Sequence, residues 1–92
     1  MGLEIAGTIV ETGEGVSRFK VGDRVAALLA GGGYAEFCAV EGGHCLPIPS
    51  GLSFVEAAAI PETFFTVWSN IFHGHEIPER GMFLVHGGSG GI

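Results

Sequence analysis

The first half of the chain alternates short apolar runs with polar, glycine-rich turns. Four runs have the length and residue types of β-strands: Ile5–Val10, Val16–Val21, Arg24–Ala30 and Tyr34–Val40. Short strands at close spacing are typical of a small barrel or sandwich and not of alternating strand and helix units. We therefore expect a small β-barrel, because closure of the sheet covers its exposed strand edges.

The pattern changes after residue 50, where prolines end the strand-like sequence. Ser53 and Glu56 have the spacing of a capping box, in which each side chain accepts a hydrogen bond from the backbone N–H of the other. This pair predicts a helix over Phe54–Ile60. Pro61 suits the first turn of a helix better than its interior, so a second helix is expected to begin there and to end at Gly74.

Several aromatic and sulfur side chains are interpreted as packing residues. An aromatic stripe at helical spacing follows Pro61 and is expected to be core: Phe64, Phe65, Trp68 and Phe72. Tyr34 is assigned to packing within the barrel. Cys38 and Cys45 are predicted to be reduced thiols, both buried, because the N-terminal residues lack the features of an export signal.

The last eleven residues combine a strand-like run with glycines. Met82–His86 is continuously apolar up to its final residue, as in a strand buried on both faces of a parallel sheet. Four glycines follow within Gly87–Ile92. A glycine-rich loop directly after a buried strand is the setting in which backbone N–H groups bind the pyrophosphate of a dinucleotide. A flexible glycine tail is the alternative interpretation of the hexapeptide alone.

Length and charge exclude several classes of function. The chain has 92 residues, which argues for one small core and against a complete enzyme. Its net charge of -6 argues against nucleic acid as a partner, since binding to duplexes depends on Lys and Arg. No apolar run has the roughly 18–20 residues that a membrane span needs. We expect a cytoplasmic chain.

Five segments taken together resemble a known family. The resemblance is to the GroES-like barrel of the medium-chain dehydrogenase/reductase superfamily, in its zeta-crystallin-like quinone oxidoreductase branch. It covers nearly the whole chain. The matching segments are Gly2–Val10 with Gly13–Val16, Phe19–Val25, Gly32–Phe37 with Leu46–Pro49, Phe54–Trp68, and Leu84–Gly91.

The resemblance implies a fold that is mainly β. Residues 1–60 would form a partial GroES-like barrel with the helix that follows it. Residues 61–92 would form a connecting helix leading into the first strand and the glycine-rich loop of an α/β Rossmann domain. The chain is therefore expected to be an internal fragment of a larger enzyme, incomplete and inactive by itself.

The implied activity is hydride transfer from NADPH to a quinone or an enone, in a protein that is usually a dimer. NADH remains an open alternative. An enoyl or alkenal reductase of the same fold is equally compatible with the residues. A different class of function, a stand-alone association module without catalysis, would use the apolar face of the second helix as its contact surface.

Candidate cofactor contacts follow from the same resemblance, whereas no catalytic residue is assigned. Thr66 would lie beside the nicotinamide ribose; the alternative is a helical threonine that bonds its own backbone. The phosphate loop would comprise Gly87, Gly88, Ser89, Gly90, Gly91 and Ile92.

No metal site is predicted. Zinc-dependent members of the superfamily have His where this chain has Leu3, and the cysteine-rich zinc lobe is missing. His73, His75 and Glu76 are close in sequence and are interpreted as solvated side chains at a helix end.

Overall fold

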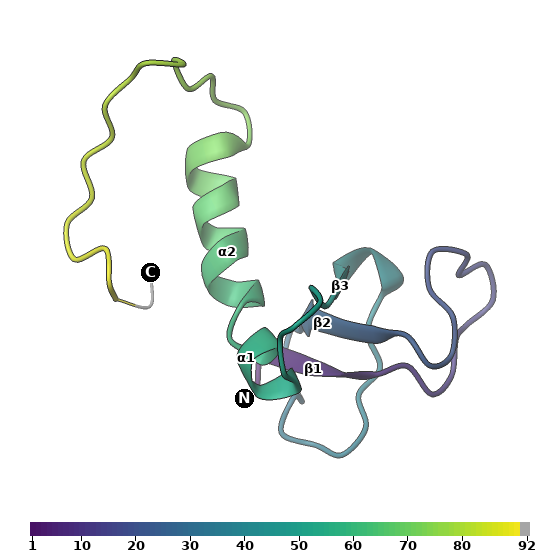
Figure 1. The fold of residues 1–92 in the computed structure, drawn as a ribbon. Helices are drawn as coiled ribbons and strands as arrows, with labels where there is room; N and C mark the ends of the chain where they lie inside the picture. Colours follow the sequence, from purple (N-terminus) through teal and green to yellow (C-terminus); the bar gives the residue numbers. More distant parts are fainter. Residues whose placement is uncertain (91–92) are drawn as a thin grey trace. The chain divides into compact units, whose positions relative to one another are not determined.

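A computed structural model describes residues 1–90, and Gly91 and Ile92 lie outside the described part. The chain forms two compact units, residues 1–62 and the chain from Thr63 onward, and each is described by itself. Figure 1 shows the elements in chain order: β1 (Glu4–Thr8), β2 (Arg24–Leu28), the 3-10 turn η1 (Gly42–His44), β3 (Cys45–Pro47), α1 (Phe54–Ala58), α2 (Pro61–Val67) and the π-helical turn η2 (Trp68–Phe72).

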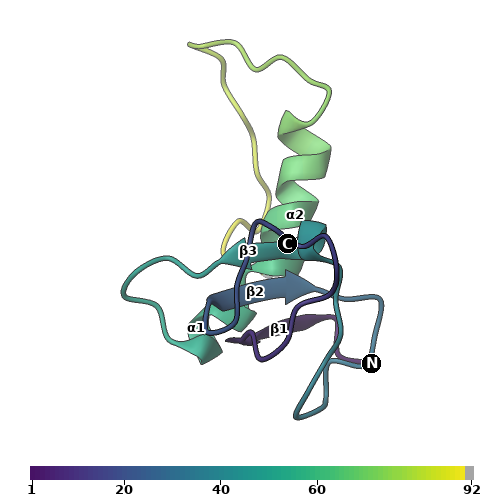
Figure 2. The same ribbon diagram turned by 90° about the vertical axis from the view of Figure 1, so that its right-hand side faces the viewer.

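The three strands form one antiparallel sheet in the order β1-β2-β3 (Figure 2). Ala6 of β1 lies opposite Ala26 of β2, which lies opposite Leu46 of β3. Two of the four expected strands are confirmed: Ile5–Val10 as β1, which begins one residue earlier and ends two earlier, and Arg24–Ala30 as β2, which ends two residues earlier. β3 was not expected, and it contains Pro47 at an edge of the sheet, where a missing N–H is tolerated.

The expected strands Val16–Val21 and Tyr34–Val40 are wrong, because both segments are loops. At the end of the segment Val16–Val21 the backbone forms a turn. Asp23 N–H donates to Lys20 O at 3.1 Å, and Lys20 N–H donates to Asp23 Oδ2 at 3.0 Å. These bonds satisfy polar groups that a strand would place in a ladder. In the second, Tyr34 is exposed instead of packed, so that assignment is wrong as well.

One face of the sheet carries the larger core. Phe19, Val25, Ala27 and Cys45 are buried there, and partly buried Ile5, Ile9 and Val40 pack against them. Alternate side chains of a strand point to one face, so odd-numbered residues of β1 and β2 supply this core. Phe19 is 9% exposed although it comes from a loop. Burial of its ring joins the loop to the sheet.

Helix α1 packs against β1 and β2, where the even-numbered side chains of the strands lie. Ala26, Ala57 and Pro61 are buried. The Arg24 guanidinium lies 4.5 Å from the ring centre of Phe54 and donates to Leu52 O at 3.1 Å. These contacts fix the start of α1 against the sheet, since the guanidinium binds both the ring and a carbonyl beside the helix.

The predicted capping box is confirmed. Glu56 N–H donates to Ser53 Oγ at 3.1 Å, and Ser53 N–H donates to Glu56 Oε1 at 2.9 Å. The helix ends at Ala58, two residues earlier than expected. Pro61 begins α2 as predicted. After the π-helical turn, Gly74 adopts φ +77°, a conformation that suits glycine where a helix ends.

The capping box makes the stability of α1 depend on pH. The N–H of Ser53 lowers the pKa of Glu56 below its ordinary value of 4.5. A carboxyl whose pKa is depressed in the folded state stabilises the fold above its unfolded pKa, and this stabilisation is lost as the pH falls through the folded pKa. Glu56→Gln keeps an acceptor oxygen but removes the charge.

We therefore expect wild type to be more stable than Glu56→Gln at pH 7, with a difference that disappears well below the ordinary pKa. Urea unfolding of both proteins across this pH range measures it. If the difference in unfolding free energy between the two proteins stays constant with pH, the charge of Glu56 is not its cause.

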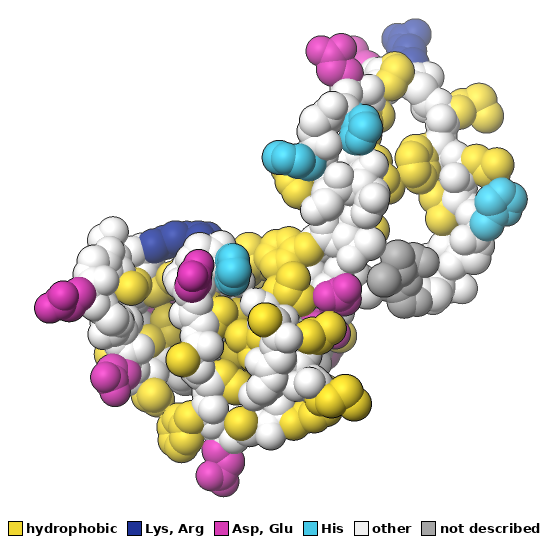
Figure 3. Space-filling view, turned by 180° about the vertical axis from the view of Figure 1, so that it is seen from behind, with side chains coloured by type: hydrophobic (Ala, Val, Ile, Leu, Met, Phe, Trp, Pro, Cys, Tyr) yellow, Lys and Arg dark blue, Asp and Glu magenta, His cyan; other side chains and the backbone are white. Residues whose placement is uncertain are grey.

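Residues 63–90 expose most of their apolar side chains (Figure 3). The aromatic stripe is therefore not core as expected: Phe64, Trp68 and Phe72 are exposed, and Phe65 is half-buried. The rings of Trp68 and Phe72 stack at 5.4 Å on one another. A stripe of this kind is buried only where another apolar surface covers it.

The expected strand Met82–His86 does not form within the described residues. Its side chains from Met82 to Val85 are exposed. A strand buried on both faces requires neighbouring strands in a sheet. The sheet of residues 1–90 consists of β1, β2 and β3 alone.

Candidate functional site

Thr66 lies in the last turn of α2 and is half-buried. Its carbonyl accepts a hydrogen bond from Asn70 Nδ2 at 2.8 Å. Its hydroxyl has no hydrogen-bond partner among the described residues, so the bond to its own backbone that was considered for a helical threonine is not present there. The hydroxyl is therefore available to a polar ligand.

Residues 87–90 form a tight, exposed turn. The N–H of Gly90 donates to Gly87 O at 3.0 Å, and Gly87 adopts φ +63°. A Cβ atom at Gly88 would lie 3.3 Å from Cγ1 of Val85, and one at Gly90 would lie 3.3 Å from Gly87 O. The turn is exposed, with the side chain of Val85 against Gly88 on one side.

The remaining predicted loop residues, Gly91 and Ile92, lie outside the described part. Within residues 1–90, no hydrogen bond joins Thr66 to the turn at residues 87–90. The cofactor role of Thr66 and of the glycine-rich loop therefore stays a prediction, and the described residues show no hydrogen bond between the two.

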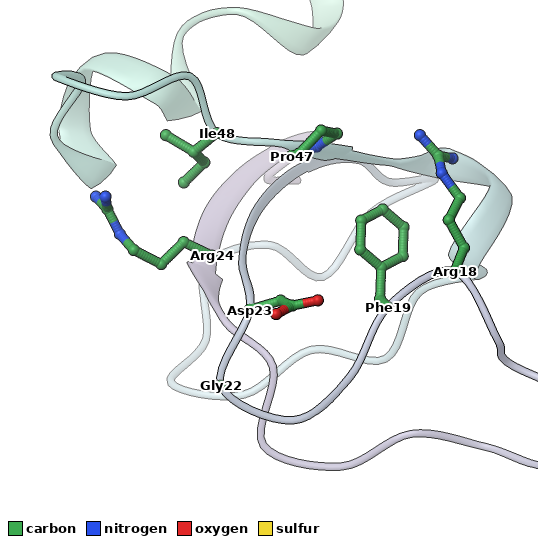
Figure 4. Close-up of a pocket in the computed structure, with 7 residues that line it drawn as sticks. All are labelled: Arg18, Phe19, Gly22, Asp23, Arg24, Pro47 and Ile48. Atoms are coloured by element: carbon green, nitrogen blue, oxygen red, sulfur yellow. The ribbon is translucent and has the colours of Figure 1, made fainter.

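Sequence reasoning missed a cavity of about 520 Å³ in the first unit (Figure 4). Its lining residues are Arg18, Phe19, Gly22, Asp23, Arg24, Pro47 and Ile48. Figure 4 shows Arg18 and Arg24 on opposite sides, with Asp23 between them. No motif joins these residues in sequence; only the packing of the loop at Phe19 against the sheet places them together.

The charged groups of this cavity already have partners. Lys20 Nζ donates a hydrogen bond to Asp23 Oδ1 at 2.8 Å. This bond lowers the pKa of Asp23. Arg24 is held by Leu52 and Phe54, and Arg18 lies 4.8 Å from the ring centre of Phe19. We interpret these contacts as structural, since they join loops to the sheet.

A second and larger hollow, which we call the β1 groove, has a volume of about 820 Å³. It lies along β1 and is lined by Ile5, Gly7, residues 8–13, Val25 and residues 36–40. Most of these side chains are apolar or small. The groove therefore suits an apolar chain or side chain better than a charged ligand.

No three side chains of His, Cys, Asp or Glu come together as a possible metal site within residues 1–90. His73, His75 and Glu76 are exposed. Separately, none of the described helices is both long and apolar enough to cross a membrane.

The two cysteines differ in environment. Cys45 is buried, and burial raises the pKa of its thiol. Cys38 is exposed, so the expectation that both are buried is wrong for Cys38. The loop that carries Cys38 does not join the sheet, and the thiol donates a hydrogen bond to Gly32 O at 3.4 Å.

This difference predicts two rates of thiol modification in the folded chain. Cys38 is expected to react with a disulfide reagent at least about tenfold faster than Cys45, since thiolate character and access control the rate. Stopped-flow absorbance would measure both phases. Cys38→Ser is expected to remove the fast phase and Cys45→Ser the slow one; loss of the fast phase in Cys45→Ser instead would contradict the structure.

The chain is similar to known proteins along its whole length. The family described as "Alcohol dehydrogenase GroES-like domain" matches residues 1–50. Proteins named quinone oxidoreductase from Rattus norvegicus and Mus musculus are 40% and 39% identical over 92 residues, which is 99% of this chain and 28% of each relative. A synaptic vesicle membrane protein VAT-1 homolog from Danio rerio is 39% identical over 99% of the chain and 19% of its own length. The chain thus spans less than a third of these relatives.

Proposed function

Because the chain belongs to the alcohol dehydrogenase GroES-like family, we propose that it is part of an oxidoreductase that transfers hydride from NADPH to a quinone or an enone. One observation carries the proposal: identity near 40% to a protein named quinone oxidoreductase extends over 99% of the chain, past the family match at residue 50. The matched length includes α2 and the glycine-rich turn.

The residues of the second unit fit a dinucleotide. The hydroxyl of Thr66 would bond a polar edge of the nicotinamide ribose. The turn at Gly87 would present backbone N–H groups to the pyrophosphate, with Gly91 and Ile92 continuing the loop. The cofactor supplies the hydride; the protein binds and orients it against the acceptor.

We propose that the reaction needs no zinc. Leu3 stands where zinc-dependent members of the superfamily have His, and its side chain has no ligand atom. The acceptor oxygen would then be polarised by hydrogen bonds from side chains or water. Stoichiometric zinc in the purified full-length gene product would contradict this part of the proposal.

A second function is favoured by a separate observation. The exposed aromatic side chains Phe64, Trp68 and Phe72 form a surface that a non-catalytic association module would use. An enoyl or alkenal reductase differs from the first proposal in substrate only. We propose a cytoplasmic homodimer for the catalytic protein.

The discriminating experiment is an assay of the full-length gene product for NADPH oxidation against a panel of quinones, enones and enoyl thioesters. We expect turnover with quinones or enones; a folded product inactive on the whole panel with both NADPH and NADH would favour the association module. The chain of 92 residues alone is expected to show no measurable NADPH binding by cofactor fluorescence. Micromolar affinity of this chain would contradict that expectation.

A further inference from the structure

A carboxylate of β1 accepts a hydrogen bond from the first turn of α2. Glu62 N–H donates to Glu4 Oε2 at 3.1 Å, and the two residues are 58 positions apart in the chain. Both residues are half-buried and belong to the unit of residues 1–62. The bond therefore joins a strand of the sheet to the start of the helix that carries Thr66, the residue predicted to contact the cofactor.

The start of α2 needs an acceptor that its own sequence does not supply. The first N–H groups of a helix have no partner within it, and Pro61, the first residue of α2, has no N–H. Whereas α1 is capped by the neighbouring Ser53, the residue before Pro61 is Ile60, whose side chain has no acceptor atom. Glu4 provides a carboxylate, which the helix dipole favours at this end and which binds an N–H more strongly than a neutral oxygen does.

The side chain of Pro61 gives the same turn an apolar contact. This ring is fully buried. Glu4 is an even-numbered residue of β1, so its side chain lies on the face of the sheet against which α1 packs. A buried ring alone resists displacement of the turn but allows it to rotate. The hydrogen bond from the adjacent Glu62 is directional and therefore restricts this rotation.

Thr66 lies one helical turn beyond the bonded N–H. Residues four apart share one side of a helix and are separated by about 6 Å along its axis. The next residue on this side is Asn70, whose Nδ2 donates to the carbonyl of Thr66 at 2.8 Å. The first turn of α2 thus fixes the backbone from which the hydroxyl of Thr66 projects.

We propose that Glu4 is a positioning residue of the proposed cofactor site, an inference that rests on the proposed function. Its carboxylate holds the first turn of α2 and thereby sets the place of the Thr66 hydroxyl, the group proposed to bond the nicotinamide ribose. Glu4 acts through the helix and does not itself touch the cofactor. Its effect on NADPH affinity therefore depends on the hydroxyl of Thr66.

Three substitutions separate the reach of the side chain from its charge. Glu4→Gln keeps an acceptor oxygen at the same distance from the backbone but removes the charge. Glu4→Asp keeps the charge but withdraws the oxygens by one methylene group. Glu4→Ala removes the acceptor altogether. Glu14→Ala makes the same truncation in an exposed turn and is the matched control.

In the full-length gene product, we expect Glu4→Ala and Glu4→Asp to bind NADPH about tenfold more weakly than wild type, as for loss of a hydrogen bond to a charged acceptor. Glu4→Gln and Glu14→Ala are expected to stay within about threefold of wild type. In a Thr66→Val background, Glu4→Ala is expected to change the affinity less than about threefold, because the hydroxyl that it positions is gone. Fluorescence titration measures each Kd, and circular dichroism checks that each variant is folded.

A second measurement needs no cofactor. Deuterium exchange of the Glu62 amide should be faster in Glu4→Ala and Glu4→Asp than in wild type and Glu4→Gln, because the N–H loses its acceptor. Equal exchange in all four proteins would mean that the bond does not hold the turn, which overturns the inference.

The titrations distinguish failure of this inference from failure of the proposed function. A wild-type protein that binds no NADPH overturns the proposed function and the role of Glu4 with it. If wild type binds NADPH and folded Glu4→Ala binds it equally well, Glu4 does not position the site. A tenfold loss that persists in the Thr66→Val background also overturns the inference, because Glu4 then acts on another contact. If Glu4→Ala does not fold, equal affinities of Glu4→Asp and Glu4→Gln overturn it.

Discussion

Replacing Phe19 by alanine is expected to destabilise the unit of residues 1–62 by about 3 kcal/mol, within the range for truncating a buried aromatic side chain. The ring is 9% exposed and belongs to the core cluster with Val25, Ala27 and Cys45. Its removal leaves a cavity that this small core cannot refill. The change is large relative to the net stability of a chain of 92 residues.

Urea unfolding followed by circular dichroism measures this loss. Phe37→Ala is the matched control, because Phe37 is also a loop phenylalanine but is 75% exposed. The control is expected to change the free energy of unfolding by about 0.5 kcal/mol or less. Equal effects of the two substitutions would contradict the core assigned to Phe19.

Replacing Gly87 by alanine is expected to weaken NADPH binding by the full-length gene product about 5- to 30-fold. Gly87 adopts φ +63°, a conformation that costs other L-residues roughly 1–2 kcal/mol. Nothing lies within 4 Å of the added Cβ, so the backbone and not a collision causes the effect. This prediction rests on the proposed role of the turn in holding the pyrophosphate.

Gly43→Ala is the matched control for this substitution. Gly43 also has open space around an added Cβ, and its φ lies outside the left-handed region. Fluorescence titration of NADPH into both variants compares them directly. If Gly87→Ala binds NADPH as tightly as Gly43→Ala, the turn does not bind the cofactor in the conformation described.

Local signals were enough to predict some elements. The capping box of Ser53 and Glu56 involves residues three apart, and Pro61 acts through its own ring. Neither depends on distant parts of the chain. β1 and β2 were also predicted, because each combines apolar residues with glycine or charged residues at its ends.

Burial was harder to predict, because it depends on what packs against a side chain. Phe19 and Phe37 are the same residue type in similar loop sequences, yet one is core and the other exposed. Cys38 and Cys45 differ in the same way. The loops at Val16–Val21 and Tyr34–Val40 had strand-like residues, but their backbone groups found partners outside the sheet or remained exposed.

The candidate site shows a similar division. Its residues could be named from the sequence, because glycine spacing and the resemblance both point to the turn at Gly87. Two features of these residues came from the structure alone. Gly87 has a left-handed backbone conformation, and the hydroxyl of Thr66 has no hydrogen-bond partner among residues 1–90. It also revealed the cavity beside Phe19, whose residues no sequence pattern connects.

By itself, the sequence determined the helix start at Ser53, the second start at Pro61, two strands and the family of the chain. These properties depend on neighbouring residues or on the order of motifs. Only the tertiary structure decided that β3 pairs with β2 and that Phe19 closes the core. Each of these depends on contacts between residues distant in sequence. The energies of such contacts cannot be inferred from the pattern of neighbouring residues.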